Sequence, residues 1–160
     1  MSKSGEALSK ALVVAPNAAL SVFRTIMDVA IDGAGPLPGA RKAAGATLNR
    51  KGEVEAAIDA LVRSHIGMAG AQGFLANLGG WVTIPVALPA NMSALATLQA
   101  RMVAAISHLR GYDVDDPRVR TAIFTCLLTQ DSVDELIRNE KIPSTPMAMA
   151  TAPVLSLIHI

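Results

Sequence analysis

Apolar side chains recur at spacings of three and four along most of this chain, which is the period of one face of an α-helix. The pattern runs through residues 17–31, returns in a helix that starts near residue 53, and returns again in residues 93–110 and 117–130. A shorter helix is expected over residues 40–48. No segment has a convincing strand pattern. The periodicity predicts an all-α domain of about five to six helices.

Local signals predict where several of these helices begin and end. Asp116 directly precedes a proline, a pairing that caps and starts a helix. Ser132 and Glu135 have the spacing of a capping box, which predicts a last short helix from that point. Glycine readily adopts the left-handed conformation that ends a helix. We expect helix ends at three glycines: Gly33, Gly52 and Gly111.

The centre of the chain, residues 66–100, contains no formally charged side chain over 35 residues. It is rich in glycine and contains two prolines, so we expect a central apolar hairpin of two helices. Gly67, Gly70 and Gly73 recur every three residues, which places them along one side of a helix. The missing side chains predict close helix packing there.

The same block leaves three topologies open: a tightly packed helical hairpin, an interfacial or re-entrant insertion, and a full membrane span. Glycine-rich segments are weakly hydrophobic, and the glycines and prolines interrupt the helix, which favours the packed hairpin. If the block contacts a membrane or a partner, the side chains expected to do so are the large apolar ones near its turn. These are Phe74, Leu75, Leu78 and Trp81.

Composition supports close-packed helices rather than a β-sandwich. The chain has 160 residues, of which 51% are apolar and only 3% aromatic. Its net charge of +1 provides no bulk attraction to nucleic acid. The first 52 residues hold seven basic and three acidic groups, a balance that suits either a solvated helix face or an anionic membrane surface.

Residues with catalytic or metal-binding chemistry are sparse. His65 and His108 have no Cys or His at metal-ligand spacing, so each is expected to be a partly buried or surface histidine. Cys126 lies on the apolar face of a predicted helix and is expected to be an inert core thiol. The string DVDD at residues 113–116 matches an acid motif of some terpene cyclases, but acids before a proline more simply cap a helix. We expect no metal site and no cofactor.

A series of ordered motifs resembles the EcsC protein family. The motifs that carry this resemblance are GFLANLGG at 73–80, TIPVALPA at 83–90, LQARM at 98–102 and GYD at 111–113, with GPLPG at 35–39, VRT at 119–121 and CL at 126–127. The resemblance spans residues 16–142. It implies a mostly helical bacterial protein whose biochemical activity is not established. The family's link to an ABC transporter and secretion implies a membrane surface or transporter subunits as partners.

The resemblance implies no reaction, and we consider two classes of function. The first is a non-enzymatic accessory protein, cytoplasmic or peripheral to the inner face of the membrane; a lone cysteine and a polar N-terminus agree with that compartment. The second is an uncharacterised enzyme, such as a hydrolase, that uses polar groups near the glycine block. The candidate polar residues are Gln99, Arg101, Tyr112 and Asp113. Arg101 follows an uncharged segment on an apolar helix, so its charge requires a partner.

The two ends of the chain are expected to lie outside the domain. Residues 1–15 form an N-terminal arm and residues 143–160 an irregular tail broken by prolines. The last six residues, LSLIHI, are also one reading frame of a sequencing-adapter DNA. We therefore expect a domain that is truncated at its C-terminus. The C-terminal half of the same domain, which would pack against these helices, is expected to be missing.

Overall fold

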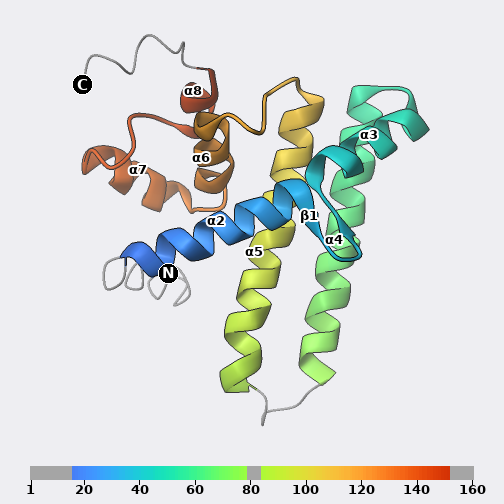
Figure 1. The fold of residues 1–160 in the computed structure, drawn as a ribbon, viewed down its shortest axis with the longest axis horizontal. Coiled ribbons are helices and arrows are strands. Elements are labelled where there is room, and N and C mark those ends of the chain that lie inside the picture. The colour runs from blue at the N-terminus through green and yellow to red at the C-terminus, as the bar shows by residue number, and fades with distance from the viewer. Residues whose placement is uncertain (1–15, 79–83, 152–160) are drawn as a thin grey trace.

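The computed structural model describes residues 16–78 and 84–151, with side chains described for 21–71 and 93–151 (Figure 1). Within these residues lie seven helices and one small antiparallel strand pair. In chain order the elements are α2 (Pro16–Asp32), β1 (Gly33–Ala34), β2 (Leu37–Pro38), α3 (Ala40–Lys51), α4 (Val54–Leu78), α5 (Ile84–Leu109), α6 (Pro117–Thr125), α7 (Gln130–Arg138) and α8 (Pro146–Thr151). The predicted all-α fold is confirmed.

Helix α5 is the centre of the arrangement, because α2, α3 and α4 all pack against it. Helices α4 and α5 run antiparallel and form the predicted hairpin, which extends well past α2 and α3 (Figure 1). Helices α6, α7 and α8 gather toward the N-terminal end of α2, away from β1, and α8 packs on α6 (Figure 1). An edge-to-face contact between Phe23 and Phe124, with ring centroids 4.5 Å apart, joins α2 to α6.

The core is built on small side chains. Ala100, Ala104 and Ala105 of α5 are fully buried, which lets three neighbouring helices approach closely. The period of three and four had predicted that the larger side chains of α5 form the core. These are Leu95, Leu98, Met102, Ile106 and Leu109, and of them only Leu98 is buried, whereas Leu95 is exposed. Alanine is a weak hydrophobic signal in sequence, so packing on three sides was not visible in the pattern.

Most predicted helix ends are confirmed. Asp116 caps α6, its side chain accepting a hydrogen bond from the backbone N–H of Arg118 at 2.8 Å. Left-handed glycines follow α2, α3 and α5, with positive φ at Gly33, Gly52 and Gly111. These ends are set by a few neighbouring residues, which is why sequence alone predicts them.

Several boundaries were wrong. Helix α5 begins at Ile84 rather than near residue 93, since Pro85 stands in the first turn, where a helix needs no N–H donor. Helix α6 stops at Thr125, and α7 begins one turn earlier than predicted because Thr129, not Ser132, is its cap. Residues 33–38 form a strand pair that the sequence did not predict. Helix α8 lies in the tail that was expected to be irregular. Residues 1–15 and 152–160 lie outside the described residues.

Candidate functional site

The β1–β2 hairpin between α2 and α3 is held in a tight fold by glycine. Gly33 has φ +92°, a conformation that other residues rarely adopt. At Gly39 the backbone is ordinary, but a Cβ would lie 2.2 Å from the carbonyl oxygen of Ile31 and 2.5 Å from the carbonyl carbon of Asp32. The end of α2 and the start of α3 therefore meet backbone to backbone, and this contact fixes the hairpin over α5.

The hairpin presents a backbone carbonyl to a buried arginine. Arg101 of α5 is only 4% exposed, and its Nε donates a hydrogen bond to the Pro38 carbonyl oxygen at 2.6 Å. Its Nη1 lies 3.1 Å from Nε2 of His65 on α4, which is also 4% exposed. One guanidinium thus joins three elements that are far apart in the sequence.

The hydrogen bonds of His65 require the neutral ring. Its Nδ1 lies 2.8 Å from the carbonyl oxygen of Leu61, which can only accept, so Nδ1 carries the proton. Arginine has no acceptor, so Nε2 of His65 must accept from Nη1 of Arg101. The pKa of His65 is lowered mainly by burial; the hydrogen bond to Leu61 opposes this shift, and the charge of Arg101 adds to it.

The charge of Arg101 is stabilised by neutral acceptors. Among the ion pairs of the described residues, none involves Arg101. Burial lowers the pKa of Arg101, but a guanidinium stays protonated at every physiological pH. The sequence had predicted only that this charge requires a partner; the partners found are a carbonyl and an imidazole.

His65 and Arg101 also mark the two ends of the uncharged block. Residues 66–78 run out along α4 and residues 84–100 return along α5, and the contact between His65 and Arg101 joins the two arms where the block begins and ends. We call residues 66–78 and 84–100 the outer hairpin. Sequence reasoning missed the pairing of His65 with Arg101. The available signal was that a helical hairpin turning near residue 81 brings residue 65 opposite residues 97–101.

The predicted polar site of four residues is not assembled. Gln99 is exposed, whereas Arg101 is buried against β2 and α4. Tyr112 donates its hydroxyl to Sδ of Met147 at 3.4 Å, and the carboxylate of Asp113 accepts from the backbone N–H of Asp115 at 3.0 Å. Arg101, Tyr112 and Asp113 therefore have separate partners. Arg101 lines neither the hollow beside α8 nor the open hollow beside Asp113.

The predicted close packing at Gly67 and Gly70 is wrong. Both glycines are exposed, and a Cβ on either would meet no described atom within 4 Å. The glycines that permit close approach are Gly33 and Gly39 instead. The side chains predicted to contact a membrane or partner lie outside the described side chains; these are Phe74, Leu75, Leu78 and Trp81. The surroundings of Gly73, the third predicted packing glycine, also lie outside them.

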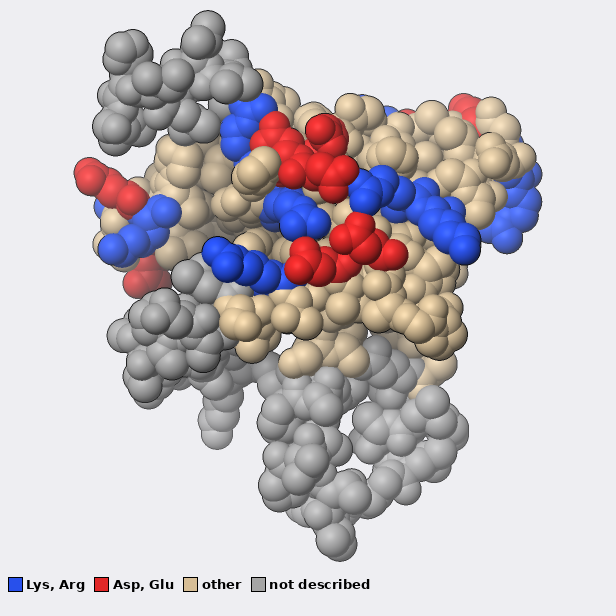
Figure 2. Space-filling view, in the orientation of Figure 1, with Lys and Arg blue, Asp and Glu red and all other residues tan. Residues whose placement is uncertain are grey.

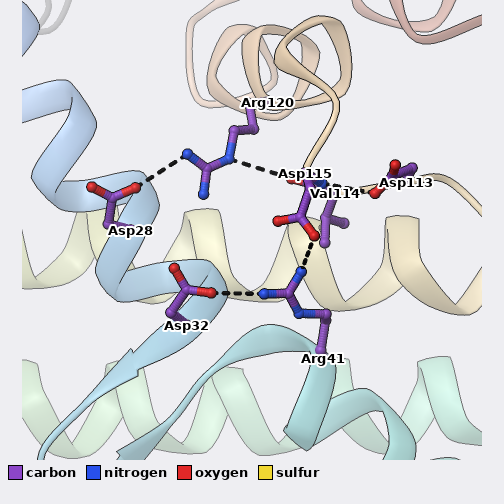
Figure 3. A network of polar contacts seen from close by, with 7 residues as sticks. All are labelled: Asp28, Asp32, Arg41, Asp113, Val114, Asp115 and Arg120. Atoms are coloured by element: carbon purple, nitrogen blue, oxygen red, sulfur yellow. Dashed lines mark hydrogen bonds and ion pairs between the residues drawn. The ribbon is translucent and has the colours of Figure 1, made fainter.

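Ion pairs tie the segment before α6 to the first two described helices (Figure 3). Arg41 of α3 bonds both Asp32, at 2.7 Å, and Asp115. Arg120 of α6 donates to Asp28 of α2 at 3.1 Å. Figure 2 shows Lys, Arg, Asp and Glu side chains gathered in a belt of both signs across the body of the molecule. The paired side chains of Figure 3 are all at least partly exposed, so each pair contributes less than about 1 kcal/mol.

One apolar hollow lies between α5, α6 and α8, lined in part by Val103, Tyr112, Ile123 and Cys126. Its volume of about 90 Å³ is far below the several hundred Å³ of a typical substrate pocket. Cys126 was expected in the core but is exposed at the end of α6. Contact with its apolar neighbours raises the pKa of its thiol, so the thiol is not activated.

These features define an all-α protein with a projecting, uncharged hairpin closed by a buried arginine–imidazole contact. No group of three or more potential metal ligands occurs in the part of the chain that the structure describes. Within that same part, none of the helices combines the length and hydropathy needed to cross a bilayer. No protein-family model, curated protein or solved structure matches the chain. The likeness to the EcsC family stays a prediction from its motifs.

Proposed function

We propose that this protein is a non-enzymatic accessory protein that attaches to a membrane surface through the outer hairpin. The observation that carries the proposal is the separation of charge from the hairpin. Charged side chains cover the body in a belt (Figure 2), whereas the outer hairpin has none on either arm. An uncharged, protruding element of this kind suits insertion among lipid head groups, where no ionic partner is required.

The described part of the outer hairpin supports this proposal on both arms. On α4, Ile66 is 65% exposed, and Gly67 and Gly70 face open space. On α5, Leu95 is exposed. Large exposed apolar side chains next to surface glycines are costly in water unless another surface covers them.

The proposed contact does not depend on anionic lipid. Arg50 and Lys51 lie at the end of α3, beside the start of α4, whereas the outer hairpin is the far end of α4 (Figure 1). Binding through the outer hairpin therefore relies on apolar burial, which salt does not screen. This separates it from attachment through the basic first third of the sequence.

The test is flotation of the full chain with phosphatidylcholine vesicles, in low salt and in 0.5 M salt. We expect a vesicle-bound fraction in both conditions. Leu78→Asp, at the last residue of α4, replaces an apolar group with a charge and is expected to reduce partitioning at least about tenfold, since burial of a leucine is worth about 2 kcal/mol.

Met147→Asp is the matched control, because Met147 is 65% exposed on α8, outside the hairpin. It should bind like the parent. Circular dichroism of both variants confirms that they are folded. Binding that requires anionic lipid and disappears in 0.5 M salt, or that Leu78→Asp leaves unchanged, would reject the outer hairpin as the membrane contact. If no chain is found in the vesicle fraction under any condition, the membrane proposal is rejected, and a protein partner such as a transporter subunit is indicated instead.

The resemblance to the EcsC family adds the biological setting to this proposal. It supports a bacterial protein that acts beside membrane transport or secretion rather than through a reaction of its own. The alternative of a hydrolase is not favoured, because Arg101, Tyr112 and Asp113 have separate partners and Gln99 is exposed.

A further inference from the structure

His65 is a titratable group in a position where the second N–H of its charged ring, at Nε2, would have no hydrogen-bond acceptor. In the neutral ring, Nδ1 donates to Leu61 and Nε2 accepts from Arg101, so both nitrogens are used. Adding a proton to Nε2 would point an N–H at the N–H of Nη1, 3.1 Å away. The hydrogen bond would become a contact between two donors on two buried cations, which is strongly unfavourable.

We propose that protonation of His65 opens the contact between α4, α5 and the β1–β2 hairpin, so that mild acid loosens the base of the outer hairpin. Arg101 cannot release its proton to relieve the repulsion. It can only move away from His65. Arg101 also donates to the Pro38 carbonyl of β2. The same movement therefore disturbs the hydrogen bond between the β1–β2 hairpin and α5.

No acidic group of the described residues faces His65 to stabilise its charged form. On α4 itself, Glu55 pairs with Arg110 and Asp59 is exposed. On α3, which packs against α4, the titratable side chains are all basic: Arg41, Lys42, Arg50 and Lys51. From α5 the only charge on His65 is that of Arg101, since His108 is exposed near the helix end.

The direction of the pH dependence follows from linkage. The pKa of His65 is lowered in the folded state, so the opened or unfolded chain binds more protons than the closed one. The closed state is therefore fully favoured above a pH of about 6.5 and is progressively lost below it. Uptake of one proton on opening raises the open population by up to about tenfold for each pH unit.

The test is hydrogen–deuterium exchange of the full chain at pH 7.5 and pH 5.5, corrected for the intrinsic effect of pH on exchange. Peptides that contain residues 33–40 and 58–66 should open several-fold more at pH 5.5. Peptides from α7, which is remote from His65, should not change. His65→Gln keeps an acceptor for Arg101 but cannot be protonated, so its exchange in these segments should be the same at both pH values.

His108→Gln is the matched control, because it removes an exposed histidine of the same helix pair and should keep the pH response. An unchanged pH response in His65→Gln would overturn the proposal. So would an NMR titration of the unmodified chain in which the His65 ring takes up its proton at or above pH 6.5. That measurement needs no variant, so the proposal can be refuted even if His65→Gln fails to fold.

Discussion

Gly39→Ala is the substitution for which the structure makes its sharpest statement about stability. Gly39 precedes α3 with φ −63° and ψ 166°, a conformation that alanine adopts without strain. No side-chain cap is lost, because glycine supplies none. The main cost of the substitution is therefore the space that the new methyl group needs, with a smaller cost because alanine is a poorer N-cap residue than glycine.

That space is filled by backbone atoms. The added Cβ would lie 2.2 Å from the Ile31 carbonyl oxygen and 2.7 Å from that of Asp32. Normal contact requires the end of α2 and the start of α3 to separate by about 1 Å. Both helices are anchored by core residues on the other side, Ile31 at 1% exposure and Ala40 at 0%. We expect a loss of about 3 kcal/mol or more, the upper part of the range for overpacking.

The assay is urea unfolding of the full chain, followed by circular dichroism. With a slope of about 2 kcal/mol per molar urea, Gly39→Ala should lower the midpoint by about 1.5 M. Gly70→Ala is the matched control, because it adds the same methyl group where nothing lies within 4 Å. It should raise stability by about 1 kcal/mol through helix propensity. A neutral Gly39→Ala, or equal losses in both variants, would refute the reasoning.

Two further predictions concern polar groups. Arg101→Lys should lower stability by about 2 kcal/mol in the same urea assay. One ammonium cannot reach both the Pro38 carbonyl and Nε2 of His65, so a buried acceptor is left unpaired. A variant as stable as the parent would show that the contact is dispensable. Asp116 has its pKa lowered to about 2, first by the side chain and then by the backbone N–H of Arg118, so it contributes stability above a pH of about 4 that is lost as the pH falls towards 2. Asp116→Asn keeps the cap but cannot titrate, so the difference in thermal midpoint between parent and variant should shrink from pH 5 to pH 2; a constant difference would contradict this.

Sequence determined the helical fold and most helix ends. A repeat of three and four predicts a helix wherever it occurs, and a cap depends on residues within one turn of the helix end. Asp116 before a proline and the glycine after α3 are of this kind, and both are confirmed. The cap of α7 was placed one turn late because Thr129 and Ser132 both have capping side chains, and only the course of the chain selects between them.

The polar contacts that carry the candidate site were decided by tertiary structure. His65 and Arg101 are 36 residues apart, and Arg101 and Pro38 are 63 apart, so no local pattern records either contact. The space beside each glycine was equally hidden. Gly70 lies at a spacing that suggests packing but faces open space, whereas Gly39 looks like a turn residue and touches backbone. A glycine's spacing shows which side of a helix it occupies, but whether another chain segment fills that side depends on where the helices cross.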